Sequence, residues 1–434
     1  MSTLRCYFSL FLSLILLALL PRTLASDAFQ APRPILVRIT KDTSTSLYTM
    51  SIRTGSRLVL DLGGPLLWST CLAAHSTVPC RSDVCAAAAV QDNPWNCSSS
   101  TDGRGSDGGG GRGLCACSAY PYNPLNGQCA RGDVTTTPML ANVTDGVNPL
   151  YPVAFPVHAA CAPGALLGSL PSGAVGVAGL SGAPLSLPSQ VAASLKVERK
   201  FALCLPGGGG TGAAIFGGGP FHLLVVPEEF GMVSNGLSYI SYLRNPKNGG
   251  FYLDVVGIAV NHRGADVPPD SLALDAGTGH GGVMLSTVAP YTALRPDIYR
   301  AVIEAIDAEL RLIARAPPSW PFERCYQRSA MWWTRIGPYT ASVDLMLAGG
   351  QNWTIVGASA VVEVSQEAAC FAFVDMGAAA APAVIIGGHQ MEDNLVVFDL
   401  EKWQFGFSGL LLGTMTRCGN FDFSIGSHNK KCSI

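Results

Sequence analysis

Two patterns occur twice in this chain, in the same order and at nearly the same spacing. The segment 58–63 (LVLDLG) returns as 272–278 (LALDAGT), which places the second aspartate 214 residues after the first. The segment 175–179 (VGVAG) is echoed by 384–388 (VIIGG), with its glycine displaced by 211 residues. Because both displacements agree so closely, we interpret the chain as two homologous lobes of about 200 residues each, one following the other.

The local patterns within both halves are those of short strands. Glycine (49) and proline (29) are frequent and interrupt runs of β-branched and aromatic residues. Strands are predicted at 47–52, 57–60, 251–260, 353–356, 384–386 and 395–398. One helix is predicted to begin near Pro296, because apolar residues recur at helical spacing to Ile313, ahead of Pro317. A shorter helix is predicted after Pro188. The fold class is therefore all-β with a few helices.

An aspartate at the end of an apolar strand in each lobe suggests a specific chemistry. Asp61 and its counterpart would meet where the lobes face each other, and two adjacent carboxylates share one proton because both cannot ionise cheaply. One then acts as a base on water while the other acts as an acid, which is the arrangement of an aspartic peptidase. Small hydroxylated residues beside each aspartate, and glycines that let the loops approach, complete that design.

Motifs spread over nearly the whole chain identify a resemblance. They are VLD at 59–61, LWSTC at 67–71, AYPYNP at 119–124, GVAGL at 176–180, LSLPSQ at 185–190, FALCLP at 201–206, IFGGGP at 215–220, PYT at 290–292 and IGGHQMED at 386–393. Together they resemble the pepsin-like aspartic proteases (the A1 family), and within them the group of TAXI-type xylanase inhibitors, extracellular dermal glycoproteins and basic 7S globulins. The resemblance implies two β-barrel lobes flanking a cleft, with an N-terminal lobe at 26–230, a C-terminal lobe at 236–420 and a polar tail at 421–434.

The residues at the expected catalytic positions depart from a working protease. The first loop reads Asp61-Leu62-Gly63-Gly64 and has lost both supporting hydroxyls, so we interpret Asp61 as a relic in preference to a functional acid. The second position has two possible registers. Asp275 fits the local pattern and keeps Thr278, whereas aligning the apolar continuation at 283–287 puts His280 there, and we prefer the His280 register. Under either register the dyad is degraded.

The segment expected to form the flap over the cleft is also altered. Residues 120–124 (YPYNP) supply aromatic side chains, but their prolines stiffen a hairpin tip that would have to open over a substrate. The sequence therefore predicts a pseudo-protease without peptidase activity.

The N-terminus and the cysteines both indicate a secreted protein. A basic residue, a 14-residue apolar run and the small residues before Ser26 are typical of a signal peptide at 1–25, and the run is shorter than the roughly 20 residues of a membrane span. Six disulfides are predicted among the twelve cysteines Cys71, Cys80, Cys85, Cys97, Cys115, Cys117, Cys129, Cys161, Cys204, Cys325, Cys370 and Cys418, with Cys432 left over.

Two pairings are expected individually. Cys325 and Cys370 should pair because both lie in the second lobe, away from the crowded set, and the resemblance implies that Cys204 pairs with Cys418. Asn142 and Asn352 stand in acceptable N-glycosylation sequons. No metal or other cofactor is expected, because the paired cysteine spacings lack a second CxxC or a nearby histidine pair.

Charge limits the partners. The 28 basic and 30 acidic side chains give a net charge of −2, which argues against nucleic-acid binding and against a polybasic membrane surface. We expect a monomeric, secreted, extracellular protein of the apoplast whose partner is a secreted glycoside hydrolase, most directly a microbial endoxylanase that it inhibits in plant defence. The alternatives are an atypical aspartic endopeptidase and a cell-wall or storage glycoprotein of the 7S globulin type.

The candidate inhibitory residue lies near the last cysteine of the predicted disulfide set. In xylanase-inhibiting relatives an imidazole precedes the last conserved cysteine, but residues 409–417 contain no histidine here, and Arg417 is the charged candidate. A cation suits the acidic pair of a hydrolase cleft. His389 is interpreted as a packed or surface histidine in preference to an inhibitory one.

Overall fold

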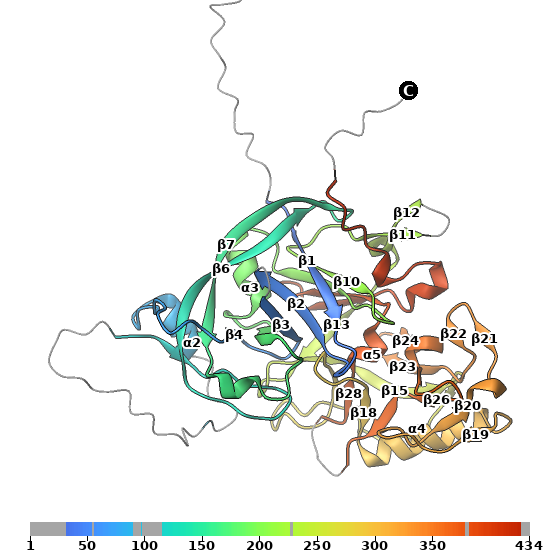
Figure 1. Ribbon diagram of the computed structural model, residues 1–434. Helices are drawn as coiled ribbons and strands as arrows, with labels where there is room; N and C mark the ends of the chain where they lie inside the picture. The colour runs from blue at the N-terminus through green and yellow to red at the C-terminus, as the bar shows by residue number, and fades with distance from the viewer. Residues whose placement is uncertain are drawn as a thin grey trace, which may run out of the picture.

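The structure is a computed structural model that describes residues 32–53, 56–89, 97, 115–225, 229–377 and 382–426. Strands dominate both halves of the chain, which lie side by side, the blue-to-green half next to the yellow-to-red half (Figure 1). The predicted signal peptide, the end of the polar tail with Cys432, and the glycine-rich insert at 98–113 fall outside the described residues. Within the described part, no helix is long and apolar enough to span a membrane.

The first half of the chain supplies twelve strands of the described structure. They are β1 (Ile35–Lys41), β2 (Tyr48–Arg53), β3 (Ser56–Asp61), β4 (Leu67–Ser69), β5 (Ser118–Ala119), β6 (Gly132–Thr144), β7 (Pro149–Cys161), β8 (Ala174–Gly179), β9 (Lys200–Cys204), β10 (Thr211–Phe216), β11 (His222–Val225) and β12 (Glu229–Met232). Helices α2 (Asp83–Ala89) and α3 (Leu187–Leu195) belong to the same half.

The second half supplies the remaining strands and the longest helix of the described residues. The strands are β13 (Ser238–Arg244), β14 (Phe251–Leu253), β15 (Val255–Val260), β16 (Arg263–Gly264), β17 (Val283–Leu285), β18 (Thr292–Leu294), β19 (Arg315–Ala316), β20 (Cys325–Gln327), β21 (Trp333–Thr334), β22 (Gly337–Pro338), β23 (Val343–Leu347), β24 (Asn352–Ile355), β25 (Val361–Glu363), β26 (Ala368–Phe371), β27 (Phe373–Asp375), β28 (Val384–Ile386), β29 (Leu395–Asp399) and β30 (Gln404–Phe407). The helices are α4 (Pro296–Glu309) and α5 (Gly388–Met391).

The two halves share a strand pattern, although their sequences differ. In the first half β3 runs parallel to β8, β8 runs antiparallel to β4, and β4 runs parallel to β7. In the second half β17, β28, β18 and β27 repeat these three pairings in the same order and with the same directions. The internal repeat predicted from the sequence is therefore present in the backbone.

A continuous sheet joins the halves. Strand β9 pairs with β10 on one side and with β29 on the other, and β29 continues through β30 to β13. The rings of Phe201 on β9 and Phe398 on β29 stack at 4.8 Å, and Phe251 packs on Phe398 at 4.6 Å. Because both lobes contribute strands and aromatic side chains to one sheet, its hydrophobic core extends through both.

Most predicted elements are present, with two instructive differences. The predicted strand 251–260 is two strands, because the chain changes sheets at Asp254: Leu253 pairs with Val283, whereas Val255 pairs with Leu347. Helix α4 begins at Pro296 as expected but ends at Glu309. Its buried residues from Ile298 to Ile306 form the inner face, and proline at its first turn suits the helix start because proline has no N–H to satisfy.

Six disulfides join the twelve cysteines that the sequence singled out. The pairs are Cys71–Cys161, Cys80–Cys115, Cys85–Cys117, Cys97–Cys129, Cys204–Cys418 and Cys325–Cys370. The last two are the pairs expected individually. Cys325 and Cys370 are direct neighbours on β20 and β26, while Cys204–Cys418 ties the central sheet to the C-terminal segment.

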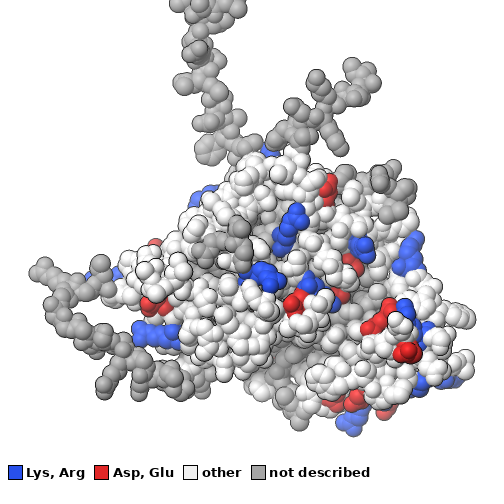
Figure 2. Space-filling model, in the orientation of Figure 1, with Lys and Arg blue, Asp and Glu red and all other residues white. Residues whose placement is uncertain are grey.

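Charged side chains are sparse on the face shown in Figure 2, and both signs are interspersed. This agrees with the small share of charged residues in the chain, 13%. The face offers no extended surface of a single sign.

Candidate functional site

Asp61 lies at the end of β3 and is only 8% exposed. It pairs with Gly179 at the end of the parallel strand β8, and its Oδ1 accepts a hydrogen bond from the backbone N–H of Gly63 at 2.9 Å. The following loop passes so close to β8 that a Cβ at Gly64 would lie 2.7 Å from the Cα of Gly179. The glycines at 64 and 179 therefore let the loop and the strand approach and enclose the carboxyl group.

Burial raises the pKa of Asp61 to about 6, although the backbone N–H groups of Gly63 and Gly64 oppose this by stabilising the carboxylate. No neighbouring carboxylate within the described residues contributes to the shift. In an aspartic dyad, repulsion between two carboxylates is a principal cause of the raised pKa. Asp61 is therefore an isolated acid, not half of a pair that shares a proton.

Ser286 occupies the position in the second lobe that Asp61 occupies in the first. Strand β17 ends at Leu285, which pairs with Ile386 on the parallel strand β28, and the N–H of Ser286 donates to the carbonyl of Ile386 at 3.0 Å. Like Asp61, Ser286 is almost fully buried, and its Oγ accepts a hydrogen bond from the backbone two residues on, Val288 N–H at 3.3 Å. A hydroxyl at this position does not ionise as a carboxyl group does.

Thr287, the residue after Ser286, joins the two strand ends. Its Oγ1 donates to the carbonyl oxygen of Leu60 at 2.7 Å and accepts from the N–H of Leu62 at 3.2 Å, so it contacts the backbone on both sides of Asp61. Thr287 is completely buried. The residue that follows Asp61, Leu62, is apolar, so only one lobe contributes a hydroxyl at this position.

Both sequence-based registers for the second catalytic position were wrong. Asp275 is exposed in a tight turn, where it accepts from the N–H of Gly277 at 2.8 Å and from the hydroxyl of Thr278 at 2.7 Å. His280 is exposed in the same turn, and its carbonyl accepts from the N–H of Asp275 at 2.9 Å. Asp, Gly and Thr at this spacing form hydrogen bonds with one another within the turn. The same residue pattern therefore occurs in an ordinary turn and in a catalytic loop.

The register error has an identifiable origin. The His280 register treats the apolar run 283–287 as the continuation that follows the catalytic loop, which in the first lobe is β4. In the structure Val283–Leu285 is the strand that precedes the loop, the equivalent of β3. The usable signal was three apolar residues followed by a small polar one, but serine in place of aspartate hid the correspondence.

The predicted flap segment is anchored to its own lobe. The indole Nε1 of Trp68 donates to the carbonyl of Tyr122 at 3.0 Å. The amide of Asn123, which is fully buried, donates to the carbonyls of Leu166 and Gly168 at 2.8 and 2.7 Å. Burial raises the pKa of Tyr122, and the charge of Asp61 adds to this, so this tyrosine lies near the relic acid. These contacts and the Cys97–Cys129 disulfide fix the segment over the Asp61 end of the lobe.

The other predicted residues lie apart from Asp61. Arg417 is exposed between two short 3-10 helices near the C-terminus, and Asn142 and Asn352 are exposed on β6 and β24. His389 is 9% exposed on α5, where its Nδ1 lies 3.4 Å from Glu392. Among the described residues no group of three potential ligands is arranged to hold a metal ion.

Comparisons with known proteins agree with this geometry. The sequence profile of the xylanase inhibitor N-terminal domain matches residues 48–218, and that of the xylanase inhibitor C-terminal domain matches residues 250–409. The chain belongs to the xylanase-inhibitor (TAXi) family. One matched segment lies in each lobe, and together they contain the two strand ends that carry Asp61 and Ser286.

Individual TAXi relatives carry different names. "Chitinase CLP" of Oryza sativa subsp. japonica is 44% identical over 402 residues, covering 91% of this chain and 92% of the relative. "Probable aspartic proteinase GIP2" of Nicotiana benthamiana is 31% identical, covering 94% and 96% of the two chains. The crystal structure of edgp superposes with a TM-score of 0.80 at 33% identity, covering 91% of this chain and 98% of that one. The two-lobed, pepsin-like fold predicted from the sequence is confirmed.

The hydroxyl of Thr287 yields a stability prediction. In Thr287→Val the shape is kept, but the carbonyl of Leu60 and the N–H of Leu62 lose their buried partner. We expect the free energy of unfolding to fall by about 2 kcal/mol in this variant. Thr287→Ser keeps the hydroxyl and should lose less, which denaturant unfolding with intact disulfides will measure. Equal stability of the valine and serine variants would show that the hydroxyl bridge contributes nothing.

The raised pKa of Asp61 yields a pH-dependent prediction. The folded state holds the proton up to about pH 6, whereas the unfolded chain releases it near 3.8, so ionisation destabilises the fold as pH rises between these values. Asp61→Asn removes this loss. The gain in unfolding free energy of the variant over the wild type should therefore grow by about 2 to 3 kcal/mol between pH 4 and pH 7.

Asp275→Asn is the control for this measurement. The hydroxyl of Thr278 and nearby N–H groups lower the pKa of Asp275, so its contribution is present at neutral pH and is lost on acidification. Its substitution should give no gain with rising pH. A constant difference between wild type and Asp61→Asn over the same range would contradict the burial argument.

Proposed function

We propose that this protein is a secreted, non-proteolytic inhibitor of a secreted glycoside hydrolase, most directly a microbial endoxylanase. The observation that carries the proposal is Ser286 at the position of the second catalytic aspartate, within a chain whose two lobes match the xylanase-inhibitor profiles. A single buried carboxyl group provides no acid and base pair for peptide hydrolysis. In this proposal the two-lobed fold is retained because it presents a binding surface to the hydrolase.

The segment around Arg417 has the properties of an inhibitory loop. The adjacent Cys418 is bonded to Cys204, and its N–H donates to Asp393 Oδ1 at 2.9 Å. On the other side, the hydroxyl of Thr416 donates to the carbonyl of Leu224 at 2.6 Å. Because these contacts fix the backbone, little conformational entropy is lost when Arg417 meets a partner. Its exposed guanidinium suits the two carboxylates of a glycoside hydrolase cleft.

Secretion and glycosylation belong to the same proposal. Six disulfides in the described structure are typical of an oxidising compartment, and the predicted signal peptide at 1–25 would direct the chain there. The asparagines of both sequons are exposed and accessible to a glycan. We propose an extracellular, monomeric protein that binds neither nucleic acid nor membranes.

The name of the rice relative favours a carbohydrate-related second candidate. Hydrolysis of a glycosidic bond ordinarily needs two carboxyl groups placed about 5 to 10 Å apart. At this site Thr287 bonds to the backbone on both sides of Asp61, and Ser286 stands in place of a second carboxylate, so these strand ends do not supply the pair. A role as a carbohydrate-binding wall or storage glycoprotein needs no such pair, and chitin belongs in the functional assay.

The first functional prediction concerns proteolysis. Because Asp61 lacks a carboxylate partner and the flap segment is anchored, we expect negligible cleavage of haemoglobin or casein between pH 3 and pH 7. The assay compares the purified protein with and without pepstatin. Cleavage that pepstatin blocks and that Asp61→Ala abolishes would instead establish an atypical aspartic endopeptidase.

The second functional prediction concerns inhibition. The protein should inhibit at least one member of a panel of family-10 and family-11 xylanases, a family-12 glucanase and a chitinase, in competition with the polysaccharide. Arg417→Ala should weaken inhibition about tenfold or more, as expected for the loss of a charge-assisted hydrogen bond. Added salt, or a pH low enough to protonate the hydrolase carboxylates, should weaken it too.

Arg311→Ala is the matched control, because Arg311 is also exposed but follows α4, outside the C-terminal segment. It should leave inhibition unchanged. Absence of a complex with every enzyme in the panel would reject the inhibitor function and favour the wall or storage role. Equal loss in the two arginine variants would reject Arg417 as the contact.

A further inference from the structure

A pocket of about 380 Å³ opens between the lobes, away from the Asp61 strand ends. Lys41 of β1 and the loop at Gly207 line it from the first lobe, while α5 and the hairpin of β21 and β22 line it from the second. Its volume lies in the range of roughly 300 to 1,000 Å³ that is typical of small-molecule sites. We propose that this pocket binds a neutral saccharide ring. The inference goes beyond the inhibitor function and does not depend on it.

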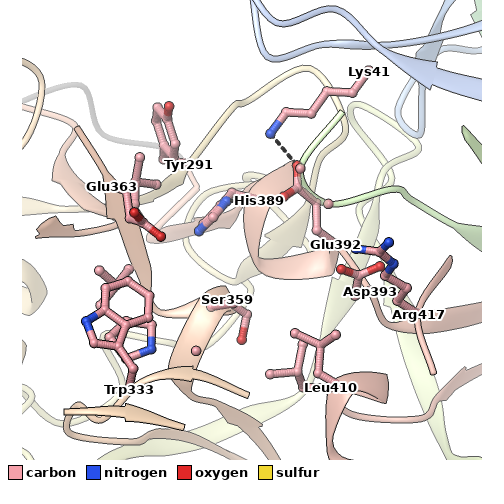
Figure 3. A pocket seen from close by; sticks show the side chains of 18 residues that line it. Lys41, Tyr291, Trp333, Ser359, Glu363, His389, Glu392, Asp393, Leu410 and Arg417 are labelled. Atoms are coloured by element: carbon pink, nitrogen blue, oxygen red, sulfur yellow. Dashed lines mark ion pairs between the residues drawn. The ribbon is translucent and has the colours of Figure 1, made fainter. Parts of the chain in front are cut away.

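The buried carboxylate of Glu392 lies on one side of the pocket and is held there by three side chains of the protein. Glu392, which is 6% exposed, accepts from the hydroxyl of Tyr48 at 2.5 Å and pairs with Nζ of Lys41 at 2.5 Å. Its second oxygen faces Nδ1 of His389 at 3.4 Å. Figure 3 shows Lys41 reaching down to Glu392 and the imidazole of His389 projecting from α5 towards Glu363.

The other nitrogen of His389 is the group that points to a ligand. Nε2 is buried, lies in a residue that lines the pocket, and has no hydrogen-bond partner within the described structure. A buried polar atom without a partner costs free energy that a bound molecule can recover. Because Nδ1 faces Glu392, the neutral imidazole presents Nε2 as an acceptor, and a ligand hydroxyl satisfies either protonation state since it both donates and accepts.

An aromatic wall stands across the pocket from Lys41. Trp333 on β21 is 45% exposed, and the guanidinium of Arg328 lies 4.6 Å from the centre of its ring. Arg328 in turn pairs with Glu363 at 2.8 Å, which holds the cation against the indole. An indole next to hydrogen-bonding groups suits a pyranose, because the sugar presents C–H bonds on its faces and hydroxyls around its edge.

The charges of the pocket favour an uncharged ligand. Two of the three carboxylates that line the pocket form ion pairs, Glu363 with Arg328 and Glu392 with Lys41. The third, Asp393, feels the charge of Arg417, which also lines the pocket. A site for a phosphate or a metal ion would show an excess of one sign. Because positive and negative groups here lie close together, the net electrostatic field in the pocket is small. The pocket therefore offers oxygen and nitrogen atoms that suit hydrogen bonds to the hydroxyl groups of an uncharged ligand.

Calorimetric titration of the full-length protein with xylohexaose, N-acetylchitohexaose, cellohexaose and inorganic phosphate tests the proposal. We expect at least one of the three saccharides to bind, and the choice among them identifies the source of the sugar. Trp333→Ala should weaken that binding about tenfold, the loss of one stacked aromatic contact. His389→Ala should weaken it as well, and the unfolding midpoint of each variant shows whether the fold is retained.

Trp332→Ala is the matched control, since Trp332 precedes Trp333 but is 79% exposed, packs towards Tyr339 and does not line the pocket. It should leave the affinity unchanged. Binding of no saccharide, stronger binding of phosphate, or equal loss in both folded tryptophan variants would overturn the proposal. Because no hydrolase is present in the titration, its outcome is independent of whether the protein inhibits one.

Discussion

The hydroxyl of Thr287 connects the two lobes where their repeated strand patterns meet. It hydrogen-bonds the backbone on both sides of Asp61, so the end of β3 and the end of β17 are held together by one buried side chain. Because Thr287 bonds to backbone atoms, it holds the two strand ends together whichever side chains stand at the neighbouring catalytic positions. This allows the architecture to persist while Ser286 stands where a second aspartate would complete a catalytic pair.

The contacts around this junction hold the flap segment and the first lobe rigid. Asn123 anchors the flap segment to two carbonyls of the same lobe, and four disulfides join cysteines between positions 71 and 161. A peptidase needs a flap that opens over its substrate, whereas a binding protein gains from surfaces that are already ordered. The same features that argue against peptide hydrolysis thus support a role in which the protein is a partner of another enzyme.

A second junction between the lobes surrounds Glu392. Tyr48 and Lys41 reach it from the first lobe, and it faces His389 on its own short helix. Although burial alone would raise the pKa of Glu392, hydrogen bonding and charge from His389 and Lys41 outweigh it and lower the pKa. The carboxylate is therefore charged and satisfied at neutral pH. It gives the pocket beside it a fixed polar wall that complements the indole of Trp333 on the opposite side.

The sequence by itself determined the two-lobed β architecture, the position of Asp61 at a strand end, and the set of cysteines that form disulfides. These follow from local patterns, since apolar runs, turn residues and the spacing of repeated motifs are properties of neighbouring residues. Only the tertiary structure identified Ser286 and Thr287, because strand pairing defines their equivalence to Asp61 and Leu62. Asp275 shows why: its turn satisfies the same residue pattern through hydrogen bonds of its own. The pocket at Glu392 likewise joins residues some 350 positions apart, which no local pattern brings together.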